Sequence, residues 1–219
     1  MKNKIIVRVI FLQSALVTAA FGQSLYLVQK TLVNIQTSAS SPSPFTNIGP
    51  YLFGAQAPSA ATLTPPGLPA SSLVFNSSKS DYGLNGGFAS KAALDAAFPN
   101  GSYRMSGGFP TLTINVAGDL YPIVPQVTGG TWQNGVLVID PSQSNTLNIN
   151  TFTGYASSGV GGYMEIKITS ETGNDNVALD QTFSTAGLAG ATVSPAPFTS
   201  YMIPAHTLTA GLAYQMQLT

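Results

Sequence analysis

The segment from Thr131 to Phe152 constrains the fold most, because it places two strand patterns on either side of a turn. Residues 135–139 form an unbroken aliphatic run, which is typical of a strand buried on both faces. Asp140 and the proline after it favour a β-turn, since Asp suits the first position and Pro fixes φ at the second. After the turn, Leu147 and Ile149 alternate with polar residues and would share one face. The segment therefore predicts the core of a β-sandwich.

Similar strand patterns recur along most of the chain. Only 7% of the residues are charged, against about 25% in an average globular protein, and Gly and Pro are frequent, as in turn-rich all-β proteins. In the run at 24–36, we expect Leu27, Val33 and Ile35 to face inward and Lys30 to lie on the outer face of an edge strand. Further strands are predicted at 50–56, within 61–75, and at 103–106, 111–116, 163–169, 177–183, 201–203 and 214–218.

One short helix is predicted near residues 90–98, where the sequence is rich in alanine. Ser90 is a candidate N-cap, and the Pro-Asn-Gly sequence at 99–101 would end the helix. Leu94 and Phe98 are four residues apart and would share its buried face. Because so short a helix is not stable alone, it must pack on a sheet.

Residues 1–22 have the pattern of a secretory signal peptide. Three basic residues within the first eight precede a mostly apolar run at 9–20, and the small residues Ala20 and Gly22 would flank the cleavage site before Gln23. The alternative is an apolar N-terminal strand, which explains neither the basic start nor the small-residue exit. We therefore expect a secreted, extracellular or cell-surface protein.

Loss of this leader would remove three of the eight basic residues and none of the eight acidic ones, leaving a net charge of −3. That balance argues against nucleic acid and anionic membranes as partners. The sequence has no cysteine, which excludes disulfides and thiolate chemistry. We also expect no membrane span in the mature protein.

Two segments of the chain echo each other. Each has a leucine, then a turn containing glycine, then a tyrosine that opens a strand: Leu94 with Tyr103, and Leu208 with Tyr214. The second segment resembles fibronectin type III and immunoglobulin-like modules, in which a tyrosine early in strand F hydrogen-bonds to upstream backbone. With Trp132 early in the same region, residues 121–219 are similar to such modules of secreted bacterial surface proteins. We expect structural roles for Trp132, Tyr214, Leu94 and Tyr103.

This resemblance implies two immunoglobulin-like or fibronectin-like β-sandwich units, at residues 23–118 and 119–219, with the helix in the first. In such a sandwich a strand G follows strand F, whereas this sequence reaches Thr219 within or just after F. Three explanations stay open: a longer natural chain, coverage of the edge by the run from Leu25 to Ile35, or strand exchange with a second molecule. We favour a longer chain, because residues 215–218 still alternate at the terminus.

Groups suited to catalysis are sparse. His206 is the only histidine, and its place in a loop favours a surface or capping role over a Ser-His-Asp arrangement. One histidine and no cysteine cannot readily supply a zinc site. We interpret the acids mostly as solvated turn and surface residues, not as a glycosidase pair: Asp81, Asp95, Asp119, Asp140, Glu165, Glu171, Asp175 and Asp180. We predict no catalytic residue, cofactor site or metal site.

Two weaker patterns have simple structural interpretations. Glu171 with the Asn-Asp-Asn run at 174–176 offers oxygen ligands for calcium, but it lacks the spacing of a calcium loop and reads equally well as a turn. The glycine-rich runs at 83–87 and 159–162 lack the lysine and the strand-to-helix context of a phosphate-binding loop, so both are predicted to be loops.

Aromatic side chains are the best candidates for ligand contact. Tyrosine rings can stack on sugars when they are exposed, although most aromatic residues in a sandwich belong to the core. The candidates for such stacking are Tyr155, Tyr163 and Tyr201. The leading hypothesis is a non-catalytic extracellular module with a structural, adhesive or surface-display role, whose partners are polysaccharides or other surface proteins. The alternative is a carbohydrate-binding module, and a secreted hydrolase comes third.

Overall fold

In the computed structural model the chain is all-β, as predicted, and its described residues form mostly antiparallel strands and one short helix. The structure describes residues 3–17, 26–40, 42–44, 49–116, 124–150, 163–171, 179–184, 192–193 and 199–218. Within these ranges, no helix has both the length and the apolar character needed to cross a membrane.

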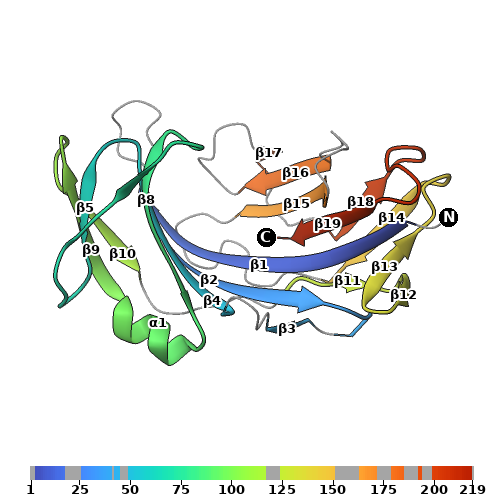
Figure 1. Cartoon of the computed structure of the whole chain (residues 1–219), viewed down its shortest axis with the longest axis horizontal. Helices are drawn as coiled ribbons and strands as arrows, with labels where there is room; N and C mark the ends of the chain where they lie inside the picture. Colours follow the sequence, from blue (N-terminus) through green and yellow to red (C-terminus); the bar gives the residue numbers. More distant parts are fainter. Residues whose placement is uncertain are drawn as a thin grey trace. The chain divides into compact units, whose positions relative to one another are not determined.

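The chain divides into two compact units (Figure 1). Unit 1 comprises Met1–Phe11, Val33–Pro44 and Pro122–Thr219, and unit 2 comprises Leu12–Leu32 and Phe45–Tyr121. The division after Tyr121 lies close to the boundary expected at residues 118 and 119. Unlike the expected arrangement, unit 1 also includes two segments from the first 44 residues.

Unit 1 contains two sheets. One follows the order β17-β16-β15-β19-β1-β13-β12, and the other the order β11-β14-β18. Most neighbours are antiparallel, but β1 with β19 and β16 with β17 are parallel. The strands, of which β1 and β2 continue into unit 2, are β1 (Asn3–Val17), β2 (Tyr26–Gln36), β3 (Ser43–Pro44), β11 (Val127–Thr128), β12 (Thr131–Gln133), β13 (Val136–Ile139), β14 (Asn145–Ile149), β15 (Tyr163–Ser170), β16 (Leu179–Ser184), β17 (Thr192–Val193), β18 (Ser200–Ile203) and β19 (Ala213–Leu218).

The predicted turn at Asp140 carries the chain from one sheet of unit 1 to the other, and the Asp140 carbonyl oxygen accepts the backbone hydrogen bond that closes it. Leu137 and Ile139 on β13 and Leu147 and Ile149 on β14 are buried in the same hydrophobic core. Because β13 and β14 pair with other strands, the segment is an arch between sheets. Full burial of β13 on both faces was a wrong expectation, since its alternate residues are only half-buried.

Strand β1 borders β19 in unit 1 (Figure 1). Residues 4–9 pair in parallel with residues 213–218, and residues 3–5 pair antiparallel with residues 137–139 of β13. The uncleaved chain thus uses the start of the predicted leader as a strand, while the predicted cleavage site lies outside the described residues. The run from 25 to 35 does not cover β19, because it pairs as β2 with β3 and β4.

Unit 2 also contains two ladders of strands. One has the order β2-β4-β8-β7 and the other β10-β9-β5-β6, and both contribute to one hydrophobic core, for example through Phe53 of β4 and Met105 of β9. Its further elements are β4 (Tyr51–Ala57), β5 (Ala61–Thr64), β6 (Ser71–Ser72), β7 (Val74–Asn76), β8 (Asp81–Phe88), α1 (Lys91–Ala97), β9 (Gly101–Gly107) and β10 (Leu112–Val116).

The helix α1 is capped and docked as predicted. The Ser90 Oγ accepts a hydrogen bond from the Ala93 N–H at 3.2 Å, which satisfies one of the free N–H groups at the helix start. Leu94 is fully buried, and the Phe98 ring stacks on Phe53 with their centroids 3.6 Å apart. These contacts hold the helix against the core of unit 2.

The glycine-rich run at 83–87 lies inside β8, so its prediction as a loop was wrong. The run pairs with β4, and Gly86 stands opposite Phe53. A Cβ added at Gly86 would come within 3.1 Å of the Phe88 ring. The missing side chain therefore makes room for aromatic packing over the sheet, a known use of glycine in strands. The run at 159–162 lies outside the described residues.

Candidate functional site

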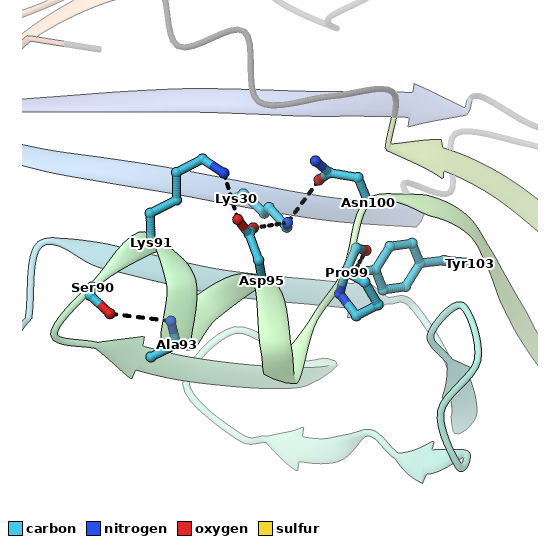
Figure 2. A network of polar contacts seen from close by, with 8 residues as sticks. All are labelled: Lys30, Ser90, Lys91, Ala93, Asp95, Pro99, Asn100 and Tyr103. Atoms are coloured by element: carbon cyan, nitrogen blue, oxygen red, sulfur yellow. Dashed lines mark hydrogen bonds and ion pairs between the residues drawn. The ribbon is translucent and has the colours of Figure 1, made fainter.

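Lys30 of β2 is fully buried, so its prediction as an outward residue of an edge strand was wrong. The strand has neighbours on both sides, and its buried positions from residue 26 to residue 32 are Tyr26, Val28, Lys30 and Thr31. A buried ammonium group needs polar partners. The Lys30 Nζ donates to the Asp95 Oδ1 and to the Asn100 Oδ1, each at 2.8 Å (Figure 2).

Three elements of unit 2 bring this cluster together. Lys30 lies on β2, Asp95 lies on α1, and Asn100 lies in the turn between the helix and β9. Asp95 follows the buried Leu94, which anchors this turn of the helix in the core. The cluster therefore ties a strand, a helix and a turn to one lysine, as Figure 2 shows.

A second lysine pairs with the same carboxylate, so that two cations share one anion. Lys91 forms an ion pair with the Asp95 Oδ2 from one helical turn earlier. Burial alone would raise the pKa of the Asp95 carboxyl, but hydrogen bonds and charge interactions with Lys30 and Lys91 outweigh it and hold that pKa below its usual value. Asp95 is thus kept ionised between two cations, which suits a positional role in docking α1.

The two echoing segments form matching tyrosine corners. Tyr103 is the third residue of β9, and its hydroxyl donates a hydrogen bond to the Pro99 carbonyl oxygen at 2.7 Å. Tyr214 is the second residue of β19, and its hydroxyl accepts a hydrogen bond from the Thr209 N–H at 2.8 Å. Both side chains are completely buried. Each unit thus fixes the entry of one core strand through a tyrosine bonded to the backbone just upstream.

The similarity continues along both strands. Met105 and Met216 follow two residues after the corner tyrosines and are also fully buried. In unit 2 the corner turn includes Asn100, so the Lys30 cluster supports that corner directly. The sequence carries the pattern Tyr-x-Met at both places, a signal for this repeat that adds to the leucine and glycine preceding each tyrosine.

Of the aromatic residues considered for sugar stacking, only Tyr201 has a described side chain. It lies on β18, half-buried and packed against the core of unit 1. Tyr155 and the side chain of Tyr163 lie outside the described part. Trp132 is half-buried on β12 and packs against the same core, and its Nε1–H donates to the Gly129 carbonyl oxygen at 2.8 Å.

The structure reveals an exposed apolar site that the sequence analysis missed. Val74 and Phe75 of β7 are 68% and 55% exposed, and the Phe75 ring contacts Tyr82 of β8 with centroids 5.2 Å apart. A three-residue strand is too short to show periodicity, so nothing in the local pattern marks these side chains as exposed. Met202 on β18 of unit 1 is a separate exposed apolar residue.

The remaining titratable groups are dispersed. His206 is exposed, and its backbone N–H donates to the Pro141 carbonyl oxygen at 2.7 Å. Asp81 is buried and accepts a hydrogen bond from the Gln56 Nε2 at 2.7 Å, which corrects its interpretation as a solvated acid. Among the described residues, no three His, Asp or Glu side chains lie together as a metal site requires. The Asn-Asp-Asn run at 174–176 lies outside that part.

Comparisons with known proteins give no family assignment, since no family model, curated protein or solved structure matches the chain.

Proposed function

We propose that the chain is a non-catalytic extracellular module with a structural, adhesive or surface-display role, built from two immunoglobulin-like or fibronectin-like units. The observation that carries this proposal is the pair of buried tyrosine corners at Tyr103 and Tyr214. A tyrosine corner is a hallmark of such sandwiches. The presence of such a corner in both units supports two related modules.

The leader pattern supports the extracellular site of action. An exported chain without cysteine has to rely on packed cores and buried polar clamps in place of disulfides. The corner bonds and the Lys30 cluster provide such clamps in the described residues. The proposed net charge of −3 after export also disfavours anionic partners.

Export can be tested by expressing the full chain in a Gram-negative host and determining the N-terminal sequence of the protein outside the cytoplasm. The proposal expects a chain starting at Gln23. A variant with Gly22→Arg, which replaces the small residue before the cleavage site, should stay uncleaved. Full-length protein confined to the cytoplasm would contradict the proposal.

A second candidate function is carbohydrate binding, which the exposed Phe75 ring favours together with Tyr82. Exposed aromatic platforms bind sugars by stacking, and exposed apolar side chains often mark interaction sites. Binding to a panel of insoluble polysaccharides should then fall on Phe75→Ala but not on Val74→Ala, the matched exposed neighbour. Equal binding by both variants would exclude this site.

A further inference from the structure

The position beside β19 is filled by a segment that the proposed export would remove. Residues 4–9 pair with residues 213–218 on this side, and β15 pairs on the other. Tyr214, Met216 and Leu218 are completely buried in this arrangement. We call the place that residues 3–9 occupy the β19 slot.

The β19 slot has two walls made of strand backbone. β19 forms one wall over six residues, and β13 forms the other where it pairs with residues 3–5. On β13 the residues Leu137 and Ile139 are buried in the same core as those of β19. Removing residues 1–22 would therefore leave unpaired N–H and C=O groups on both walls and expose apolar core, a combination that favours addition of another strand.

The register defines which segment fits. Ile5, Val7 and Val9 stand opposite Tyr214, Met216 and Leu218, so the slot matches apolar residues at every second position. In unit 2 the strand that corresponds to β19 is β9, and its neighbour is β10, the next strand in sequence. There Ile114 stands opposite Tyr103 and Leu112 stands opposite Met105.

We propose that the exported protein uses the β19 slot to bind an extended segment of another polypeptide, with apolar residues at alternate positions. This inference rests on the proposed export, because only loss of residues 1–22 opens the slot. It identifies the partner by chemistry: a single β-strand donated in trans, held by main-chain hydrogen bonds and by alternate side chains in the core.

The test starts from the full chain, folded intact, with a protease site inserted between residues 22 and 23. After cleavage and removal of the released segment, a fluorescent peptide with the sequence of residues 3–17 is added, and binding is followed by anisotropy. Two variant peptides are matched: one carries Asn at positions 5, 7 and 9, and the other carries Asn at positions 4, 6 and 8.

The proposal expects the parent peptide to bind and to restore amide protection at residues 214–218. Changes at positions 5, 7 and 9 should weaken binding by at least about tenfold, because they would bury polar groups in the core, whereas changes at 4, 6 and 8 should have a much smaller effect. Equal binding of both variants would overturn the proposal. So would a cut protein that binds no peptide and keeps residues 214–218 protected by its own chain.

Failure of the proposed function gives a different result. An exported protein that retains residues 1–22 would contradict cleavage in the cell, while the peptide measurements on the cut chain would still report whether the slot accepts a strand. Correct cleavage with no peptide binding would instead overturn the strand-acceptor proposal alone.

Discussion

Strands β9 and β19 begin in the same way but are completed differently. Each opens with a tyrosine corner and continues with a buried methionine, at Met105 and Met216. The next strand in sequence, β10, covers β9 in antiparallel orientation, whereas β1, from the opposite end of the chain, covers β19 in parallel. The corner thus fixes how a strand enters the core without fixing which strand lies beside it.

The source of the neighbouring strand decides how firmly each core strand is held. The connection from β9 to β10 is short, so pairing costs little loop entropy. The neighbour of β19 comes from a segment about 200 residues away, and loss of that segment would leave the edge open. We therefore expect the two units to respond alike to changes in their shared features and differently to changes at the N-terminus.

Truncating the buried methionine of either strand should have the largest effect on stability, and the effect should be the same in both units. Met105→Ala and Met216→Ala should each lower the free energy of unfolding by about 2–5 kcal/mol, because each creates a cavity in a packed core. Tryptophan fluorescence during chemical denaturation reports on unit 1, because the only tryptophan, Trp132, packs against the core of that unit. A Met216 variant that melts like the wild type would show that β19 is not packed as described.

The Lys30 cluster should distinguish unit 2 from unit 1. Asp95→Ala should lower the free energy of unfolding by about 2–3 kcal/mol. It removes the carboxylate that binds the buried Lys30 ammonium and keeps the hydrogen bond to Asn100. Lys30→Met should cost less, because Asp95 is 31% exposed and can be hydrated. Far-ultraviolet circular dichroism in urea measures both. Equal losses of stability from the two changes would contradict this role of the Lys30 cluster. Neither change should alter the urea midpoint that Trp132 fluorescence reports for unit 1.

The corner hydrogen bonds are expected to contribute similar, smaller amounts. Tyr103→Phe and Tyr214→Phe should each lose about 1 kcal/mol, the usual net value of one hydrogen bond. A double-mutant comparison should give additive losses, since the two bonds lie in separate cores. A loss of stability in only one of the two variants would show that the two corners are not equivalent.

The smallest expected effect is a loss of folding stability of unit 2 at acid pH. Because the pKa of the Asp95 carboxyl is lower in the folded chain than in the unfolded chain, its ion pairs stabilise the fold above the unfolded value of about 3.9. This stabilisation is lost as the pH falls through the folded-state pKa. Urea midpoints measured from neutral pH to about pH 3 should vary less in Asp95→Asn than in the wild type. The exposed control Glu171→Gln should leave the profile of unit 2 unchanged.

Local features of the fold could be predicted from the sequence where neighbouring residues determine them. The turn at Asp140, the alternation of Leu147 and Ile149, and the Ser90 cap all depend on contacts within a few residues. The resemblance predicted the corner at Tyr214, and the matching leucine, glycine and tyrosine positions indicated a similar segment at Tyr103.

Features that depend on distant residues could not be predicted in this way. Lys30 can be buried because Asp95 and Asn100 bind its ammonium group, and these partners lie 65 and 70 residues further along the chain. The glycine run in β8 is a strand because it pairs with β4, and the Phe88 ring lies next to Gly86. Gln36 is another case, since its buried side-chain amide exchanges two hydrogen bonds with the backbone of Val127 in unit 1. Periodicity carries no information on such pairings.

Hydrogen exchange at β9 and β19 tests the central comparison most directly. The full chain with a protease site after residue 22 is measured before cleavage and after removal of residues 1–22. The account predicts that alternate amides in residues 213–218, those directed at β1, lose protection on cleavage, while those directed at β15 and all protected amides of β9 keep theirs. Unchanged protection of every amide in residues 213–218 would contradict it.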